Sequence, residues 1–326
     1  MKESIHRTFG RQAFGLDPGG YHAARPAYPD WVFDVLCERC GLAPNAVTFE
    51  IGAGTGTATH RLLELGANPL VAVEPDDRLA AFLRETTQDK ALTVVAASFE
   101  EAMLEEASFD LGVSATAFHW LTEDVALTKV AGLLRPGGWW AMVWNVFGDS
   151  HRLDPFHEAT KELLKGPSSP SDGNGEIPFA LDAEARVAAL EQTHAFDIVD
   201  HRTSAWSLVL DAEQTAALYA TYSNINIRPD REAVLAELHR VARDEFYGRV
   251  TRNMVTSLYV ARRRSHPLPS PRNLRFGASF AKSSIFRSNL FSTTGPGFSS
   301  DFAFRHEGIC TILTRFPRRN GKHEVP

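Results

Sequence analysis

Residues 46–56 read AVTFEIGAGTG, and this stretch decides the fold. Its first six residues form a short apolar run that is typical of a buried β-strand. Glycine then recurs at every second position, as is needed where a turn is tight and a ligand approaches the backbone. A helical pattern over residues 58–65 follows, so the N–H groups and positive dipole end of that helix face the same space. The stretch therefore predicts a strand, a turn and a helix, with a ligand at the carboxyl end of the strand.

Strand and helix patterns alternate along most of the chain. After a helix over 30–41 and the unit above, the expected strands cover residues 71–73, 92–96, 109–114 and 139–144, with helices over 79–84 and 125–134. Two later strands, over 196–210 and 250–261, flank helices over 211–222 and 229–246, for which Asp211 and Asp230 are the expected N-caps. We therefore expect an α/β fold: a Rossmann-like, doubly wound, mostly parallel sheet of seven strands, with helical additions that form a lid.

Composition narrows the class of protein further. The chain has 326 residues, of which 44% are hydrophobic and 23% charged, as in a globular protein. No stretch approaches the ~18 consecutive apolar residues of a membrane helix, so no membrane partner is expected. Three cysteines exclude a disulfide scaffold, and the lone CxxC of Cys37 and Cys40 is interpreted as ordinary helix residues. Because the N-terminus also lacks the apolar core of a secretory signal, the predicted location is cytoplasmic.

Charge is distributed unevenly between two parts of the chain. Residues 1–264 carry 25 Lys and Arg against 37 Asp and Glu, whereas residues 265–326 carry 9 against 3. Because phosphate binding needs clustered cations, the acidic part argues against nucleic acid as a partner. The predicted organisation is an N-terminal lid segment (1–30), a main domain (31–264) with a helical insertion at about 211–246, and a basic Ser/Phe/Arg-rich tail (265–326). The tail is predicted to be disordered, or alternatively to bind a partner.

The spacing of the glycines distinguishes a dinucleotide site from a site for another cofactor that contains a ribose. The dinucleotide fingerprint G-x-G-x-x-G would need glycine at position 57, where this chain has Thr57. The spacing present is E-x-G-x-G-x-G, from Glu50 to Gly56. A second acid, Glu74, ends the next predicted strand 18 residues beyond Gly56, where a carboxylate accepts both hydrogen bonds of a ribose diol. Both classes use that contact, so Glu74 alone does not discriminate between them.

The segment Glu50-Ile-Gly52-Ala-Gly54-Thr-Gly56 resembles motif I of the class I S-adenosylmethionine-dependent methyltransferases, in a small-molecule, type 11-like subgroup. Further segments resemble the same family in order and spacing: ASFE at 97–100, FDL at 109–111, SATAFHW at 114–120 and LLRPGG at 133–138. The resemblance covers roughly residues 10–264 and is strongest over 47–145. It implies a methyltransferase that moves a methyl group from S-adenosylmethionine to a small-molecule acceptor by in-line displacement.

The resemblance also implies which residues bind the cofactor. Glu50 would lie near the methionine part, and Tyr21 and Arg25 would cover it, with Arg25 offering a cation to the methionine carboxylate. A lid held only by proline and aromatic packing is the alternative interpretation of that N-terminal segment. The expected cofactor-binding residues are Tyr21, Arg25, Glu50, Gly52, Gly54, Gly56, Glu74, Pro75, Ser98, Phe99 and Ala115.

His119 is the candidate catalytic residue. It follows the fourth predicted strand, where this fold presents residues to substrate, and an imidazole titrates near neutrality, as suits a general base. The alternative is that His119 only shapes the pocket. Several aromatic residues form either an aromatic cage or ordinary core: Trp120, Trp144, Trp206, Tyr219 and Tyr222. No metal is expected, because the other histidines lack recognised ligand spacing.

Two other functions compete with methyl transfer. One is a protein that binds S-adenosylmethionine without catalysis, which the same motifs would serve. The other is a nicotinamide-dependent oxidoreductase, against which Thr57 and the Pro-Gly-Gly turn at 136–138 both count.

Overall fold

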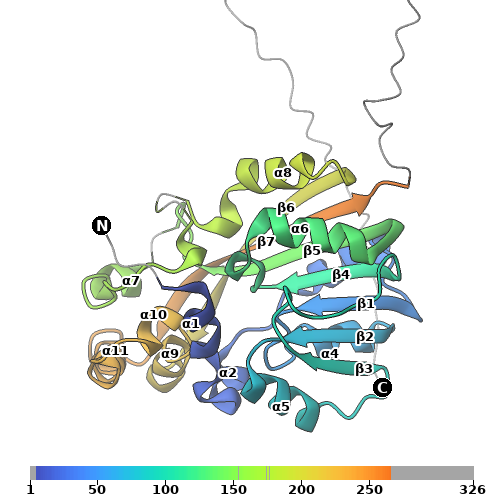
Figure 1. The fold of residues 1–326 in the computed structure, drawn as a ribbon. Coiled ribbons are helices and arrows are strands. Elements are labelled where there is room, and N and C mark those ends of the chain that lie inside the picture. Colours follow the sequence, from blue (N-terminus) through green and yellow to red (C-terminus); the bar gives the residue numbers. More distant parts are fainter. Residues whose placement is uncertain (1–4, 153, 174, 176, 266–326) are drawn as a thin grey trace, which may run out of the picture. The chain divides into compact units, whose positions relative to one another are not determined.

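The computed structural model describes residues 5–152, 154–173, 175 and 177–265. Its centre is one sheet of seven strands in the order β3-β2-β1-β4-β5-β7-β6 (Figure 1). The strands are β1 (Ala46–Ile51), β2 (Ala67–Glu74), β3 (Leu92–Ala96), β4 (Phe109–Ala115), β5 (Leu134–Phe147), β6 (Phe196–Leu210) and β7 (Val250–Arg263). Only β7 runs antiparallel to its neighbours. The predicted seven-stranded, mostly parallel α/β fold is confirmed.

Strand β1 is the point at which the direction of winding reverses. It pairs in parallel with β2 on one side and with β4 on the other, so that Glu50 lies opposite both Ala72 and Val113. The chain runs outward from β1 to β3, and then returns to place β4 and β5 on the other side of β1. The crossover segments on either side of this point diverge and leave a crevice beyond the carboxyl ends of β1 and β4.

Helices cover both faces of the sheet. The described α-helices are α1 (Arg7–Gln12), α2 (Pro18–Ala24), α3 (Asp30–Arg39), α4 (Thr59–Glu64), α5 (Asp77–Thr86), α6 (Glu123–Leu133), α7 (Pro155–Thr160), α8 (Ala183–Gln192), α9 (Ala212–Tyr219), α10 (Ser223–Asn226) and α11 (Arg231–Asp244). Short 3₁₀ turns are η1 (Ala13–Leu16), η2 (Phe118–Trp120), η3 (Pro170–Asp172) and η4 (Phe179–Leu181). Helices α3 and α4 share one apolar cluster with the sheet, and α6 and α8 share the other.

Alternation along β5 explains why both faces need cover. Trp140 and Met142 pack into the cluster on the α6 side, whereas Ala141 and Val143 pack into the cluster on the α3 side. All four residues are buried. Successive side chains of a strand point to opposite faces, so a strand that is apolar at every position must be buried on both.

A third apolar cluster joins the helical addition to the far end of β7. Phe156 of α7, Tyr219 of α9, Leu238 of α11 and Val250 of β7 belong to it. The helix expected over 211–222 is α9, which ends at Tyr219, and a separate short helix, α10, begins at Ser223. The aliphatic and aromatic side chains of this addition therefore form a core separate from the two that cover the sheet.

The two expected N-caps in the helical addition have different outcomes. Asp211 caps α9 through a capping box, in which it accepts from the backbone N–H of Gln214 and receives the Gln214 side chain in return. Asp230 stands at the predicted N-cap position of α11, but its carboxylate makes no cap hydrogen bond and instead accepts from the Arg228 guanidinium, at 2.7 Å for the shorter contact. A bidentate contact with a guanidinium competes well with a single backbone N–H.

A buried ion pair ties α7 to β7. Arg252 Nε donates to Asp154 Oδ2 at 2.5 Å, and the same guanidinium donates to the Tyr219 hydroxyl. The Arg252 residue is only 2% exposed, and Asp154 also caps α7 through the backbone N–H of His157. Since both charges are removed from water, neither can lose its partner without leaving an uncompensated buried charge.

Arg252→Met should therefore lower the free energy of unfolding by about 3–5 kcal/mol, because Asp154 is left buried without its cation. Urea denaturation of the full chain measures the loss. The control is Arg240→Met, which removes an exposed guanidinium from Glu237 and Glu245 and should cost under ~1 kcal/mol. Equal losses of unfolding free energy in the two variants would show that the buried ion pair stabilises the fold no more than an exposed one.

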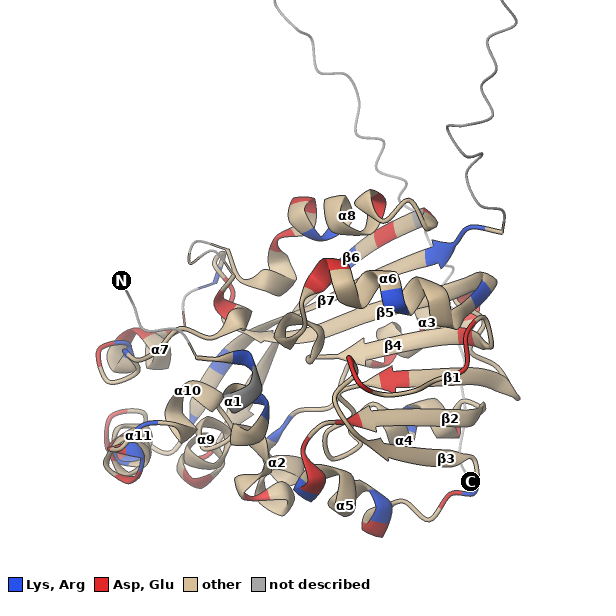
Figure 2. Ribbon diagram, in the orientation of Figure 1, with Lys and Arg blue, Asp and Glu red and all other residues tan. Residues whose placement is uncertain are grey.

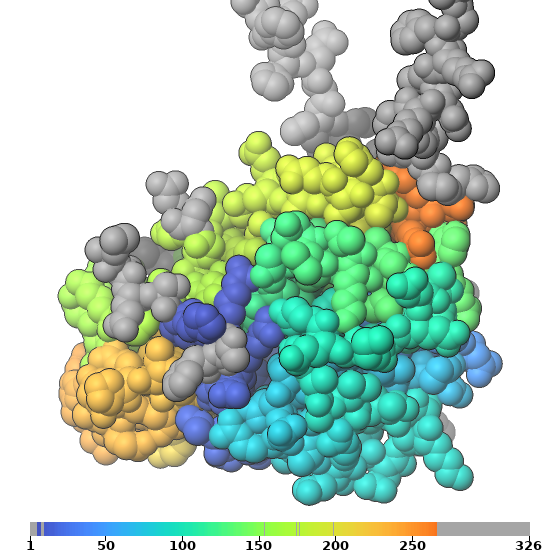
Figure 3. Space-filling view, viewed as in Figure 1, coloured from blue at the N-terminus to red at the C-terminus, as the bar shows by residue number. Residues whose placement is uncertain are grey.

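The N-terminal segment, here residues 5–29, lies between the helical addition and the sheet. Figure 3 shows its dark blue residues between the gold helices on one side and the green and cyan part of the molecule on the other. Asn226 Nδ2 donates to the carbonyl of Ala13 at 3.0 Å, and Arg78 Nη2 donates to that of Gln12 at 2.6 Å. The segment is thus bonded to both neighbours.

Two sequence predictions concern the chain beyond the sheet. The predicted disorder of the tail falls on residues that, apart from Ser265, lie outside the described part. Within the described part, no helix combines the length and the apolar character needed to cross a membrane.

Candidate functional site

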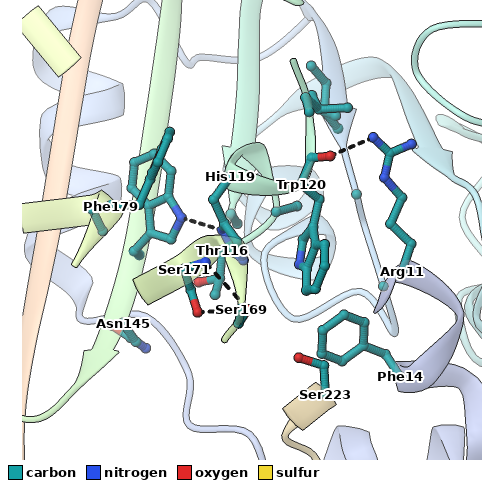
Figure 4. Close-up of a pocket in the computed structure, with 18 of the residues that line it drawn as sticks. Arg11, Phe14, Thr116, His119, Trp120, Asn145, Ser169, Ser171, Phe179 and Ser223 are labelled. Carbon is teal, nitrogen blue, oxygen red and sulfur yellow. Dashed lines mark hydrogen bonds between the residues drawn. The ribbon is translucent and has the colours of Figure 1, made fainter. Parts of the chain in front are cut away.

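A cavity of about 330 Å³ lies where the winding of the sheet reverses (Figure 4). It opens beyond the carboxyl ends of β1, β2, β4 and β5. Residues of the N-terminal segment, η3 and η4 complete its lining. Its walls include Arg11, Phe14, Tyr21, Arg25, Gly52, Gly54, Glu74, Pro75, Leu79, Phe99, Ala115, Thr116, His119, Trp120, Trp144, Asn145, Phe147, Ser169, Ser171, Phe179, Tyr222 and Ser223. Most of the sequence-predicted site residues are therefore brought together.

The three glycines of the turn after β1 have different roles. All three have positive φ angles, of 69° at Gly52, 58° at Gly54 and 94° at Gly56. A Cβ at Gly52 would come within 2.3 Å of the Ala117 Cβ, and one at Gly56 within 2.6 Å of Leu83. A Cβ at Gly54 would meet nothing within 4 Å, and Gly54 lines the cavity. Gly52 and Gly56 thus allow close packing against neighbouring side chains, whereas the open space beside Gly54 is part of the cavity.

Glu74 ends β2 at the cavity wall, with 4% of its surface exposed. One carboxylate oxygen accepts from the backbone N–H of Gly54 at 2.8 Å, and the other accepts from that of Asp76 at 2.9 Å. Burial raises the pKa of Glu74 to about 7, although these two N–H groups act against that rise. Glu74 therefore braces the glycine turn and still presents lone pairs toward the cavity, next to Pro75.

Glu50 occupies the matching position on β1, at a smaller adjoining pocket of about 50 Å³. Its carboxylate accepts from the Thr59 hydroxyl at 2.6 Å. The side chain is buried, and burial raises its pKa to about 8, opposed by the Thr59 hydrogen bond and helped by the nearby charge of Glu74. Tyr21 and Arg25 line the same pocket, so the two acids mark two ends of one continuous site.

The raised pKa of Glu50 predicts a pH dependence of stability. The folded chain holds a proton on Glu50 up to about pH 8, whereas the unfolded chain releases it near the ordinary carboxyl pKa of 4.5. Stability is therefore lost as the pH rises between those values, by at most about 1.4 kcal/mol per pH unit. Glu50→Gln should remove this loss, so wild type should weaken relative to the variant from pH 5.5 to 7.5 in urea denaturation. A constant difference between the two proteins would contradict the buried, protonated carboxyl.

Arg25 lies under a set of aromatic rings. Its guanidinium carbon is 5.1 Å from the ring centroid of Tyr21 and 5.4 Å from those of Phe147 and Tyr222. It donates one hydrogen bond, to the carbonyl of Thr221 at 3.1 Å, and its Nε has no partner among the described residues. The cation is thus held by rings while part of its donor capacity stays free beside the cavity.

Two of the predicted cofactor residues do not reach the cavity wall. The Ser98 hydroxyl donates to Glu101 at 2.7 Å instead of facing the cavity, and Gly56 lies behind the turn. Phe99, which follows Ser98 in the sequence, is buried and does line the cavity. Ala115, at the end of β4, lines it too.

His119 lies on η2, just after β4, and is 5% exposed. Its Nδ1 accepts a hydrogen bond from Trp144 Nε1 at 3.1 Å. Burial, together with the charges of Arg25 and Arg7, lowers the pKa of His119 to about 3. The imidazole is therefore neutral at physiological pH, and it is a much weaker base than the sequence prediction assumed.

Sequence reasoning found Tyr21 and Arg25 in the N-terminal segment but missed Arg11 and Phe14, which also line the cavity. Arg11 donates to Glu100 at 2.8 Å and to the carbonyl of Trp120 at 2.7 Å, and the ring of Phe14 meets that of Trp120 edge-on at 5.7 Å. Figure 4 shows Arg11 and Phe14 approaching Trp120 from this side. Nothing in the local pattern marks these residues, because their partners lie about 90 to 110 positions away.

The remaining predictions about side-chain chemistry concern cysteine, aromatic and metal-binding residues. Both thiols of the CxxC are free, with Cys37 exposed and Cys40 buried. Of the five aromatic residues considered as a cage, Trp120, Trp144 and Tyr222 line the cavity. The described residues hold no cluster of three or more potential metal ligands.

Comparison with known proteins identifies the class to which this site belongs. Residues 49–142 match a family described as a methyltransferase domain. The chain is 27% identical over 238 residues to an uncharacterized methyltransferase-like protein of Schizosaccharomyces pombe, a match that covers 71% of this chain and 86% of that protein. It is 35% identical over 137 residues to an uncharacterized methyltransferase of Mycobacterium bovis, covering 41% of this chain and 52% of that protein. The match thus spans about half the length of the mycobacterial relative.

A solved structure shares the fold. Phosphoethanolamine N-methyltransferase 2 of Haemonchus contortus, in complex with S-adenosylhomocysteine and phosphomonomethylethanolamine, superposes with a TM-score of 0.50 at 13% identity. The match covers 80% of this chain and 60% of that one.

Residues 49–142 carry a methyltransferase domain, and over longer stretches the chain is similar to methyltransferases. The family resemblance predicted from the glycine turn is confirmed, and so is the class of reaction, methyl transfer.

Proposed function

We propose that this chain binds S-adenosylmethionine in the cavity and transfers its methyl group to a small-molecule acceptor. The observation that carries the proposal is the continuity of the site. It runs from the open space above Gly54, between the carboxyls of Glu74 and Glu50, to the aromatic walls around His119.

Each part of the cofactor has matching side chains in this arrangement. Glu74 is the proposed partner of the ribose diol, because its carboxylate oxygens lie at a strand end beside Gly54. Glu50, Tyr21 and Arg25 are the proposed partners of the methionine part, where the free donor capacity of Arg25 suits a carboxylate. The other proposed contacts are Gly52, Gly54, Pro75, Phe99 and Ala115, which line the cavity, and Gly56 and Ser98, which act through the loops that carry them.

Methyl transfer requires little chemical activation by the protein. The cofactor supplies a methyl group on a sulfonium, which is an activated leaving group, so the protein must mainly align the two reactants. Aromatic walls such as Trp120 and Phe179 exclude water and attract a sulfonium through their ring faces. His119 is the proposed residue in contact with the acceptor, because it lines the cavity on the segment after β4.

Two observations support a small acceptor over a macromolecule. The N-terminal segment and α10 contribute walls to the cavity, and its volume of about 330 Å³ suits a small molecule. Figure 2 shows acidic and basic residues mixed along α5 and α11, so neither of these helices carries the single-sign stripe that nucleic-acid binding needs. The Haemonchus relative was solved with a small acceptor, which fits the same interpretation. A cytoplasmic location stays a prediction from the low cysteine content.

The test is methyl transfer from S-adenosylmethionine with a labelled methyl group. The full chain is incubated with a panel of small carboxylates, phenols, amines and thiols, and labelled products are separated from the cofactor. We expect transfer to members of at least one class and none from the Gly54→Val variant. S-Adenosylhomocysteine binding without transfer to any class would favour the non-catalytic binding protein instead.

A further inference from the structure

The hydrogen bond between Trp144 and His119 determines where the imidazole carries its proton. An indole N–H is only a donor, so Nδ1 of His119 must accept with its lone pair. A neutral imidazole has one proton, which then sits on Nε2. The dashed line that ends at His119 in Figure 4 marks this contact.

The packing around Trp144 holds the indole in this orientation. Trp144 lies on β5 and is 3% exposed. Its ring contacts that of Phe179 at 5.8 Å between centroids and that of Tyr259 edge-on at 6.1 Å. Rotating the indole away from His119 would disturb both contacts and leave a buried N–H without a partner.

The other ring nitrogen, Nε2, is free to serve a ligand. His119 lines the main cavity and also a neighbouring pocket with Arg7, Asp182 and Arg186. Among the described residues, no hydrogen bond engages Nε2, and the two arginines that line the neighbouring pocket with His119 have contacts elsewhere. Arg186 pairs with Glu123 at 2.8 Å, and Arg7 donates to the carbonyl of Leu121.

We propose that Trp144 is a positioning residue that keeps His119 as a neutral Nε2–H donor to the acceptor. His119 then holds an atom of the acceptor that carries a lone pair, and it does not remove a proton from it. This inference rests on the proposed function for the identity of the bound partner. It goes beyond that function by assigning the direction of the hydrogen bond. His119 donates through Nε2, and an atom of the molecule to be methylated accepts.

Nitrogen NMR of the full chain labelled with ¹⁵N-histidine tests the tautomer directly, without any substrate. His119→Gln identifies the His119 signals by their loss. In wild type we expect the Nε2–H tautomer at pH 7 and no imidazolium down to pH 5. Trp144→Phe should convert His119 to a mixture of neutral tautomers, because Nδ1 then has no indole N–H to accept from.

Trp206→Phe is the matched control, because Trp206 donates its indole N–H to Thr256 at 2.8 Å, on the same sheet. It should leave the His119 signals unchanged. An Nδ1–H tautomer or an imidazolium at pH 7 in wild type would overturn the proposal, and so would an unchanged tautomer in Trp144→Phe.

Kinetics of three His119 variants test the donor role. The amide N–H of glutamine reaches the position of Nε2, that of asparagine falls short near Nδ1, and alanine has none. With S-adenosylmethionine and the panel acceptor that wild type methylates fastest, His119→Gln should retain kcat/KM within about tenfold, whereas the other two should lose about 100-fold. Equal losses in all three would overturn the donor role, while failure of wild type to methylate would overturn the proposed function and leave the NMR result standing.

Discussion

Gly54→Val should lower the affinity for S-adenosylhomocysteine by at least about 100-fold, or roughly 2.7 kcal/mol. The structure offers the valine side chain open space, since a Cβ at Gly54 meets nothing within 4 Å. That space belongs to the cavity, so the side chain would occupy the volume proposed for the ligand. Valine at a φ of 58° adds backbone strain to the steric block. Isothermal titration calorimetry with the full chain measures the change.

Gly41→Val separates these two effects. Gly41 follows α3, has a φ of 75°, and likewise leaves a Cβ at its position with nothing within 4 Å. The substitution therefore carries the same kind of backbone strain away from the cavity. It should reduce stability by an amount similar to Gly54→Val but leave S-adenosylhomocysteine affinity unchanged. If both variants lost affinity equally, general destabilisation would explain the result and the assignment of the cavity would fail.

Glu74→Ala should lower the affinity for adenosine by about 10- to 100-fold. Hydrogen bonds to a carboxylate contribute about 1.5–3 kcal/mol each, and the proposed contact to the ribose diol offers two. The substitution also removes the acceptor of the Gly54 N–H, so a general loosening of the turn must be separated from the ribose contact.

The comparison ligand is 2′,3′-dideoxyadenosine, which lacks the diol. Its affinity should change little in Glu74→Ala, since it has neither the 2′- nor the 3′-hydroxyl that Glu74 is proposed to bind. The control protein is Glu64→Ala, which removes an exposed acid paired with Arg61 on α4. If both nucleosides lost affinity equally in Glu74→Ala, Glu74 would act only by bracing the turn.

Much of the fold follows from local patterns. Strands β1, β3 and β4 begin and end within a residue of their predicted bounds, because each is a dense apolar run bounded by turn residues. Strand β5 is longer than predicted, because Leu134 already pairs with Phe109 of β4 ahead of an irregularity at 135–138, and the strand continues to Phe147. Helices α1 and α2 were not predicted at all. They have six and seven residues, and helices so short depend on tertiary contacts that no local pattern records.

In the site, too, residues on consecutive elements could be predicted from the sequence, whereas features set by residues distant in the sequence could not. The glycine turn and Glu74 were predictable because they lie on consecutive elements of one βαβ unit. The difference between Gly54 and its two neighbours was not, because it depends on Ala117 and Leu83, which approach from elsewhere in the fold. The weak basicity of His119 was likewise hidden, since it results from burial and from the charges of Arg25 and Arg7, which lie far away in the sequence.

The measurement that tests the central claim most directly is calorimetric titration of the full chain with S-adenosylhomocysteine and, separately, with NAD. We expect S-adenosylhomocysteine to bind with a dissociation constant near 1 μM, about 8 kcal/mol, and NAD to show no binding. Binding of NAD without S-adenosylhomocysteine would contradict the assignment of the glycine turn and of every cofactor contact derived from it.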